Sequence, residues 1–490
     1  MGEKMNNKRV SKTETFNLKK ISLVSLFIYV LLVFIFWLIA SEQLTYKESS
    51  NNIKSVESNT PIGEITSDIY VEQGFVSPVQ VIDNISLKFA TYGRENTCSI
   101  RVSLIDALSN SVIESWNIEG SSLKDNEFVE LWLNKPLFDT YNNRYTIRIE
   151  SDNAYPGNSV TLWYNNEKIS NEGMDLFVND TDIYGTLCFE VKGRDVIWFG
   201  QHYFLMATLF GLVMTLYLII INKRQSNNQQ FIGLNMINSF IKYRFLLKQL
   251  VARDFKTKYK RSVLGALWSF LNPLLTMVVQ YIVFSTIFKS DINNFPVYLI
   301  TGIILYSFFI ESVGMGLSSI TNNAALITKV YVPKYIYPFS RVLSSCINLV
   351  ISMVPLFLVI LITRTPVRPS ILLIPFSIFC IFVFCLGMAL ILSSAMVFFR
   401  DTQFLWNVVS MLWMYLTPIF YPESIIPAKY ITLYKLNPLY HFIRFSRTVI
   451  LDGVSPEPQA YFYCLIAAFG TLIVGALIFK KTQNKFILYI

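Results

Sequence analysis

The chain has 490 residues, of which 53% are hydrophobic and 15% are charged, and its mean hydropathy is +0.42. That composition excludes an ordinary soluble protein of this length, because about a quarter of the residues in such proteins are charged. The net charge of +9 alone would suit a nucleic-acid-binding protein, but the charge is unevenly divided. Residues 42–195 hold 24 acidic and 12 basic residues, whereas the rest of the chain holds 9 acidic and 30 basic residues. We therefore expect a membrane protein with one acidic region and no nucleic-acid partner.

Eight apolar stretches are each long enough for the roughly 20 residues that a membrane-spanning helix needs. Seven of them contain no charged residue, and the fourth contains only Glu311. They predict a polytopic α-helical membrane protein with eight spans. The stretches are 21–41, 196–222, 262–288, 295–320, 342–363, 369–399, 402–422 and 458–479.

Basic residues collect on the cytoplasmic side of membrane proteins, because their translocation is disfavoured. Six of them precede the first stretch, so we expect a cytoplasmic N-terminus followed by an uncleaved signal anchor. Alternation of the spans in the cytoplasmic membrane then places both termini inside and residues 42–195 outside. The expected segments are a basic tail at 1–20, the anchor at 21–41, a linker at 42–60, an extracytoplasmic β-domain at 61–195, a span at 196–222, a cytoplasmic linker with an amphipathic helix at 223–261, and a six-span region at 262–490.

Residues 61–195 alternate apolar and polar side chains, which is typical of half-buried β-strands. Ile85, Leu87 and Phe89 show the pattern, and so do residues 129–133 and 145–149. The turn-rich spacing predicts an inserted all-β domain, a jelly-roll-like sandwich of short antiparallel strands.

Aromatic rings on the surface of such a sandwich can bind sugars by stacking, and four rings are candidates for glycan contact. They are Tyr92, Trp116, Trp132 and Trp163. The alternative is that these rings fill the core or pair across strands. The two cysteines of the domain, Cys98 and Cys188, are expected either to form a disulfide or to remain buried thiols.

An amphipathic helix is predicted just after residue 238, with an apolar stripe at helical spacing and basic residues on the other face. The stripe is Tyr243, Leu246, Leu247, Leu250 and Val251. The basic residues are Lys242, Arg244, Lys248, Arg253 and Lys256. Such a helix lies along the membrane surface, where its basic face meets anionic headgroups or a phosphate. An ordinary juxtamembrane basic patch without a ligand is the alternative.

Four sequence blocks follow in order over residues 238–490, about half of the chain. They read RDFKTKYKRSVLGALWSFLNPL, NNAALITKVYVPKYIYPFSRVL, MVFFRDTQFLWNVV, and MLWMYLTPIFYPESIIP followed by LNPLYHFIRFSR. Together they resemble the membrane subunit of polysaccharide, teichoic acid and O-antigen exporters of the ABC type-2 permease family. The first 230 residues depart from the usual six-span subunit, because they add two spans and the β-domain.

The resemblance implies a transport subunit rather than an enzyme, which moves a lipid-linked cell-surface polysaccharide outward, with a polyprenyl pyrophosphate as the expected carrier. The chain contains no G-x-x-x-x-G-K-[ST] phosphate loop, so ATP and Mg are expected on a separate ATPase chain. Such ATPases act in pairs, so the resemblance also implies two ATPase copies and a homodimer of this chain. The β-domain would bind the emerging glycan or an assembly partner.

The resemblance further implies a substrate entrance at the turn of Leu264 and Gly265, where a surface helix becomes a spanning one and glycine relieves backbone strain. Trp268 suits the membrane interface. The basic residues beside the turn, which could pair with a pyrophosphate, are Lys258, Lys260 and Arg261. Membrane topology alone is the alternative explanation for these three cations.

By the same resemblance, residues 324–332 form a short helix that couples the chain to its ATPase. The coupling candidates in this loop are Ile327, Lys329, Val330, Tyr331 and Pro333. Arg400 and Asp401, which end an apolar run, either cap the span or contact the partner.

An ionisable group inside a span usually faces the protein interior or water, which makes Glu311 a channel candidate. Pairing with a neighbouring polar group is the structural alternative. Aromatic rings would let a polymer slide by stacking, although a lipid-facing position is the commoner fate of such rings. The aromatic channel candidates are Tyr281, Trp413, Tyr415 and Phe420.

Other classes of function find less support in the sequence. The two histidines, His202 and His441, are isolated, so no metal site is expected, and the Asp180-Thr181-Asp182 string is expected to be a turn. A polytopic glycosyltransferase that uses a polyprenyl-phosphate sugar is the alternative function, but Glu423 and Asp452 form no paired constellation. A membrane-anchored glycan sensor would not need six further spans.

Overall fold

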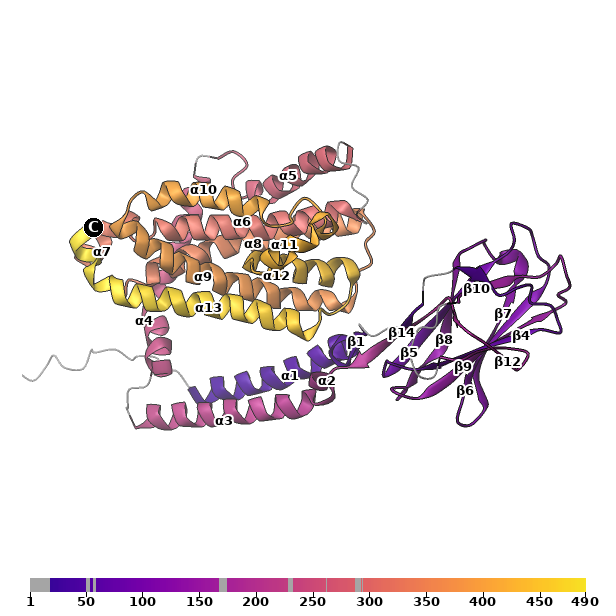
Figure 1. The fold of residues 1–490 in the computed structure, drawn as a ribbon. Coiled ribbons are helices and arrows are strands. Elements are labelled where there is room, and N and C mark those ends of the chain that lie inside the picture. The colour runs from indigo at the N-terminus through magenta and orange to yellow at the C-terminus, as the bar shows by residue number, and fades with distance from the viewer. Residues whose placement is uncertain are drawn as a thin grey trace, which may run out of the picture. The chain divides into compact units, whose positions relative to one another are not determined.

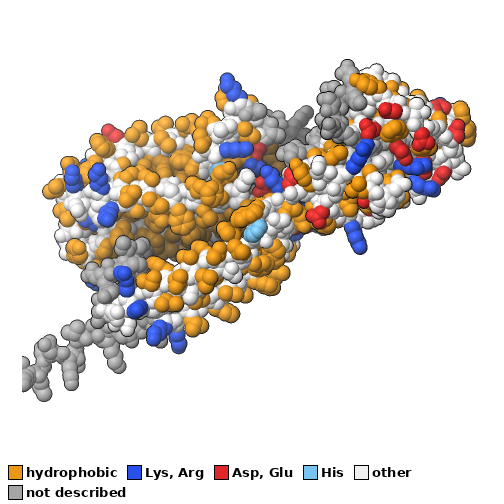
Figure 2. Space-filling model, turned by 60° about the horizontal axis from the view of Figure 1, so that its bottom comes forward, with side chains coloured by type: hydrophobic (Ala, Val, Ile, Leu, Met, Phe, Trp, Pro, Cys, Tyr) orange, Lys and Arg blue, Asp and Glu red, His pale blue; other side chains and the backbone are white. Residues whose placement is uncertain are grey.

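The chain folds into two compact units, one helical and one built of β-strands (Figure 1). The computed structural model describes residues 18–49, 53–55, 59–166, 174–227, 232–260, 262–286, 292 and 294–490. The helical unit comprises residues 1–43 and 203–490, and the β-unit comprises residues 44–202. Figure 2 shows acidic side chains gathered on the β-unit and hydrophobic side chains over the sides of the helical unit, in line with the division of charge along the sequence.

Seven helices of the described residues are long and apolar enough to cross a membrane, which confirms the polytopic α-helical fold. They are α1 (Leu18–Thr45), α3 (Tyr203–Ser226), α5 (Leu267–Thr286), α6 (Phe295–Leu317), α8 (Ile336–Ile362), α9 (Ile374–Phe398) and α13 (Pro458–Thr482).

The eighth predicted span, at 402–422, is wrong as a continuous helix. The structure has α10 (Thr402–Tyr415) in its place, and its 14 residues cover about 21 Å at 1.5 Å per residue, less than the roughly 30 Å of a bilayer core. The helix ends before Pro418, because a proline disfavours helical geometry in the residue that precedes it. Four short helices follow this break in the chain. They are η4 (Glu423–Ile425), α11 (Ala428–Lys435), α12 (Pro438–Arg447) and the π-helix η5 (Thr448–Asp452).

Helix α6 lies at the centre of the helical unit, with most of its residues buried against α8, α9 and α12. Helices α9 and α13 touch most closely, because a side chain at Gly387 or Gly475 would collide with the backbone of the other helix. Such small residues let membrane helices approach each other. The first two spans, α1 and α3, pair with each other through the Tyr29 hydroxyl, which donates to the Ala207 carbonyl at 2.6 Å.

Two segment boundaries differ from those predicted. The linker expected at 42–60 contains the end of α1 and three short strands, β1 (Tyr46–Glu48), β2 (Ile53–Lys54) and β3 (Thr60–Pro61). The second span starts at Tyr203 rather than at residue 196, because the chain first completes strand β14 (Phe189–Val196) and the short helix α2 (Trp198–Gln201). The predicted span is too long because Val196, the last residue of β14, and the apolar residues at the start of α2 continue the apolar run.

The β-unit is a sandwich of two antiparallel sheets, as the alternating pattern predicts. One sheet has the order β1-β14-β5-β10-β13, with β2 on β14, β3 on β10 and β8 on β5, and the other has the order β12-β11-β4-β9-β6-β7. Between them the inward-facing side chains form a single apolar core. The remaining strands are β4 (Tyr70–Val76), β5 (Val81–Ala90), β6 (Ser99–Asp106), β7 (Ser111–Glu119), β8 (Phe128–Phe138), β9 (Arg144–Asp152), β10 (Thr161–Asn165), β11 (Leu176–Val178), β12 (Thr181–Ile183) and β13 (Thr186–Leu187).

The Asp180-Thr181-Asp182 string, expected to be a turn, starts in the tight turn between β11 and β12, and its last two residues begin β12. Asn179 and Asp180 have φ values of 44° and 62°, a left-handed geometry that Asn and Asp tolerate in turns.

Candidate functional site

The amphipathic helix of the sequence is α4 (Ile232–Tyr259), and its apolar stripe packs against the rest of the helical unit. Leu247 and Leu250 are buried in a cluster that includes Ile320, Ile336 and Tyr337. Helix α4 is thereby held against the ends of α6 and α8, while its basic residues Lys248 and Lys256 remain exposed.

Two candidates from different predicted sets meet at the end of α4. The ammonium of Lys258, an entrance candidate, lies 2.8 Å from a carboxylate oxygen of Glu311, the channel candidate on α6. Glu311 also accepts a hydrogen bond from the side chain of Asn348 on α8. The lone acid of the predicted spans is therefore paired, and its lysine partner stands 53 residues earlier in the chain.

Hydroxyl and amide groups extend this contact to three helices. The Tyr259 hydroxyl donates a hydrogen bond to the side-chain Oδ1 of Asn348 at 2.9 Å. It is also hydrogen-bonded to the Ser269 hydroxyl on α5. Ser352 on α8 donates to the backbone carbonyl of Ser269 at 3.0 Å. The last turn of α4 is thus bonded to α5, α6 and α8.

A second ionic cluster lies one turn earlier on α4. The side chain of Asp254 is only 3% exposed and contacts Arg253 at 3.1 Å and Arg341 of α8 at 3.0 Å. Arg253 also donates to the side chain of Asn323 at 3.2 Å. Among the described residues, one carboxylate oxygen of Asp254 and the Nε of Arg341 are buried without a partner.

The two clusters line one pocket of about 640 Å³. Three cations and two carboxylates face it, together with Thr257, Met315 and Asn322. The side chains of Arg253 and Lys258 are 48% and 40% exposed, so both retain donors for an incoming anion. The pocket can therefore receive a phosphate-like group, with Glu311 as a competitor for Lys258.

The predicted entrance turn lies between α4 and α5. Gly265 has a φ of +51°, the left-handed geometry that favours glycine, and its amide donates to the Ser262 hydroxyl at 3.1 Å. Leu264 and Trp268 are exposed beside it, and so is Lys260. Arg261 lies outside the described residues.

The coupling segment is shorter than predicted. Helix α7 (Ala324–Lys329) follows η2 (Thr321–Asn323) and ends three residues before Val332. Ile327 is buried in the cluster under α4, so it packs inward instead of offering a docking surface. The exposed part is Lys329, Val330 and Tyr331, and the Tyr331 side chain is 96% exposed. Pro333 ends this part, and its carbonyl accepts from the Ile336 amide at 3.0 Å.

Arg400 and Asp401 are exposed between α9 and α10. Asp401 occupies the N-cap position of α10, yet its side chain makes no capping hydrogen bond. Of the two alternatives for this pair, capping therefore finds no support, and contact with a partner remains.

The aromatic channel candidates do not form one lining. Trp413 packs edge-on against Phe309 at 5.2 Å and donates to Asn437 at 2.8 Å. Phe420 is buried and stacks on Phe284 at 5.7 Å. Tyr281 and Tyr415 are exposed on α5 and α10.

The structure reveals a buried cation that the sequence interpretation passed over. Arg447, at the end of α12, is almost fully buried and lies 3.3 Å from the ring centroid of Tyr298 on α6. Its guanidinium donates to the carbonyls of Pro418 at 2.6 Å, Ile419 at 2.9 Å and Tyr298 at 3.1 Å. The first two carbonyls follow the broken end of α10. The available signal in the sequence was Arg447 at the end of the LNPLYHFIRFSR block, well after the break at Thr417 and Pro418. Only the fold brings Arg447 and this break together.

The aromatic candidates of the β-unit fall into two places. Trp116 is half-buried and donates to the backbone carbonyl of Trp132 at 3.0 Å, while Trp132 itself is 61% exposed. The Trp163 ring donates a hydrogen bond to the Asn126 side chain at 2.7 Å. Tyr92 is exposed in the loop where the amide of Thr91 donates a hydrogen bond to Asp125. Trp132 and Tyr92 are thus the two most accessible rings of the four.

Of the two alternatives for the cysteines of the β-unit, a disulfide or buried thiols, the disulfide is not formed. Cys98 is a buried free cysteine, so it is not bonded to Cys188. Burial raises the pKa of the Cys98 thiol, which therefore stays protonated at neutral pH. Among the described residues, no three His, Cys, Asp or Glu side chains are grouped so that they could hold a metal ion.

Comparison with known proteins identifies the family. Residues 246–451 match the family model described as ABC-2 type transporter. The O-antigen export system permease protein RfbA of Myxococcus xanthus is 31% identical over 258 residues, which cover 52% of this chain and 98% of that protein. RfbA of Klebsiella pneumoniae is 32% identical over 245 residues, or 49% of this chain and 93% of that protein. The polysialic acid transport protein KpsM of Escherichia coli is 22% identical over 250 residues, again 49% and 93%. The sequence resemblance is thereby confirmed: the chain belongs to the ABC-2 type transporter family, as a permease with an added β-sandwich rather than an enzyme.

Proposed function

We propose that the chain is the membrane subunit of an ATP-driven exporter that carries a cell-surface polysaccharide across the cytoplasmic membrane. The observation that carries this proposal is the match to O-antigen export permeases over nearly their whole length, 98% in one case and 93% in another. The polysialic acid transport protein, a more distant relative, has the same kind of cargo in its name.

The pocket at the end of α4 supports a lipid-linked substrate with a pyrophosphate headgroup. Arg253 and Lys258 are partly exposed there and present donors to an anion. In this proposal a pyrophosphate draws Lys258 away from Glu311, so that binding loosens the bond between α4 and α6. The exposed turn of Leu264, Gly265 and Trp268 then guides the lipid toward the spans.

The energy source is a separate ATPase, which binds ATP and Mg in two copies against a homodimer of this chain. The exposed residues Lys329, Val330 and Tyr331 at the end of α7 provide a docking surface for it, and Arg400 and Asp401 provide a second one. A movement of α7 reaches the pocket through Asn323, which accepts a hydrogen bond from Arg253. Both termini are cytoplasmic in this proposal, and the β-unit is outside.

The β-unit binds the emerging glycan or an assembly partner. Trp132 offers an exposed aromatic face for stacking against sugars, and Tyr92 offers a second ring, over which the Arg94 guanidinium lies at 5.0 Å. The measurement is binding of the purified polymer to the full chain and to Trp132→Ala. Equal binding by both would assign the β-unit to partner docking.

Deletion of the chain tests the exporter proposal against a glycosyltransferase. An exporter's loss removes the polymer from the cell surface and leaves its completed lipid-linked form in the membrane, whereas a glycosyltransferase's loss prevents that form from being made. An ATPase subunit is also expected to co-purify with the chain. Absence of both the accumulated polymer and the ATPase would overturn the proposal.

A further inference from the structure

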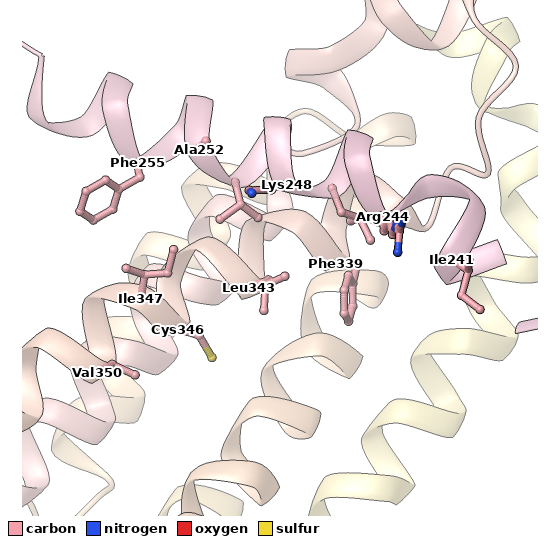
Figure 3. A pocket seen from close by; sticks show the side chains of 12 residues that line it. Ile241, Arg244, Lys248, Ala252, Phe255, Phe339, Leu343, Cys346, Ile347 and Val350 are labelled. Atoms are coloured by element: carbon pink, nitrogen blue, oxygen red, sulfur yellow. The ribbon is translucent and has the colours of Figure 1, made fainter. Parts of the chain in front are cut away.

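An apolar groove of about 950 Å³ runs between α4 and the first half of α8 (Figure 3). It shares no lining residue with the pocket at Lys258 and Glu311. The α4 wall is Leu247, Val251, Ala252 and Phe255, with Ile241 at one end. The α8 wall is Phe339, Leu343, Cys346, Ile347 and Val350.

The charged residues of the groove lie on its α4 wall. Arg244 and Lys248, one helical turn apart on α4, are the charged residues among its twelve lining residues, and no acid lines it. Figure 3 shows Arg244 beside Phe339, near the start of α8, whereas Phe255, Ile347 and Val350 lie toward the other end. Arg244 thus lies where the spanning helix begins, and Lys248 lies one turn further along α4, near the middle of the groove.

The length of the groove suits a lipid chain. From Phe339 to Val350, α8 rises about 16 Å at 1.5 Å per residue, which is roughly half of the 30 Å hydrocarbon layer. A phospholipid has an anionic phosphate at the membrane surface and apolar acyl chains below it. In the groove, the two cations suit the phosphate and the apolar walls suit an acyl chain. Basic pockets between membrane helices recognise anionic headgroups by this division of charge.

We infer that this groove holds an anionic glycerophospholipid, with its phosphate at Arg244 and Lys248 and an acyl chain between α4 and α8. The lipid fills the space between α8 and residues 241–255 of α4, the stretch that leads to the Asp254 and Lys258 contacts. It therefore stabilises α4 in the position in which the ionic pocket is formed. The inference goes beyond the proposed function, because it requires only that the helical unit lie in a membrane.

The test counts bound lipids on the full chain purified in detergent and mixed with phosphatidylglycerol or phosphatidylcholine, by native mass spectrometry. Phosphatidylglycerol is expected to bind the unchanged chain more tightly than phosphatidylcholine. The double change Arg244→Gln with Lys248→Gln is expected to weaken phosphatidylglycerol binding about tenfold, since each cation near an anionic lipid contributes to the attraction. The matched control is Lys242→Gln with Lys256→Gln, which removes the same charge from α4 outside the groove and is expected to change binding less than twofold.

A second variant and a labelling experiment address the acyl chain. Ile347→Trp narrows the apolar part and leaves both cations, so it is expected to weaken phosphatidylglycerol binding as well. On the unchanged chain, phosphatidylglycerol with a photoreactive acyl chain is expected to label Phe255, Cys346, Ile347 or Val350. The inference is overturned if the groove and control variants bind alike, or if the label appears only elsewhere. Displacement of phosphatidylglycerol by equimolar polyprenyl phosphate would also overturn it, because the groove would then belong to the carrier lipid.

Discussion

The two ends of α6 are held in opposite ways. Glu311, near one end, pairs with Lys258 through side chains that are both partly exposed, and the contact lines a pocket. Tyr298, 13 residues earlier and about 20 Å away along the helix, contacts the buried guanidinium of Arg447, which donates to backbone carbonyls. A partly exposed pair contributes little to stability and exchanges partners readily, whereas a buried cation bonded to carbonyls is costly to disturb. The α4 end of α6 can therefore respond to a ligand, while the α12 end stays fixed.

Arg447→Leu is expected to have the largest effect on stability. It leaves the carbonyls of Pro418 and Ile419 buried without their donor, so we expect the free energy of unfolding to fall by about 3 kcal/mol or more. Thermal unfolding of the purified chain measures the loss. The control is Arg444→Leu, since Arg444 is more than half exposed and lies 3.8 Å from Glu423. Similar melting temperatures for the two variants would mean that the α12 end is not fixed by Arg447.

Asp254→Asn tests whether the α4 end also contains a firm contact. The substitution keeps the shape of the buried side chain but removes its charge beside Arg253 and Arg341. We expect a loss of about 1 to 3 kcal/mol in the free energy of unfolding, because Arg341 is left with an uncompensated charge. Denaturation of Asp254→Asn and of Asp401→Asn, an exposed control, gives the comparison. A loss of unfolding free energy no larger than that of the control would mean that the ionic contacts at the α4 end, including those of Asp254, contribute little to stability.

Glu311→Gln and Lys258→Met address the exchangeable pair itself. Each is expected to lower stability by less than about 1 kcal/mol, because both side chains are partly exposed. Export is expected to fall in both, since each removes one charge of the pocket. The exchange Lys258→Glu with Glu311→Lys restores the pair and is expected to recover part of the export. Normal export and normal expression in both single variants would leave the pair with a structural role alone.

Tyr331→Ala is expected to have the smallest effect on stability, within about 0.5 kcal/mol, because the side chain is almost fully exposed. Its expected effect is a lower ratio of ATPase to permease after co-purification. Tyr415→Ala, at an exposed position on α10, serves as the matched control. An unchanged ratio in Tyr331→Ala would place the docking surface elsewhere on the α4 end.

Much of the fold follows from patterns within short stretches. The apolar runs of α8, α9 and α13 and the alternation of β5, β8 and β9 were sufficient to predict spans and strands. The prediction went wrong at 402–422, because hydropathy counts apolar residues and does not register that Pro418 ends the helix. It also went wrong at residues 42–60, where strands as short as β2 leave too few residues for a pattern.

The candidate site could be predicted as single residues and not as contacts. Lys258 and Glu311 stood out separately, one as a cation beside a turn and the other as an acid in a span. Their pairing depends on how α4 packs on α6. Arg447 was missed because its importance arises from the carbonyls of Pro418 and Ile419, and backbone carbonyls have no signature in a sequence.

Sequence patterns are sufficient to predict which segments leave water, on which strands the apolar residues alternate, and to which family the second half belongs. These properties depend on the solvation of residues close together in the chain, so they can be read locally. The tertiary structure is needed to show which charges pair, which arginine is buried, and where a groove remains between α4 and α8. These properties depend on distances between residues far apart in the chain, and packing alone sets those distances.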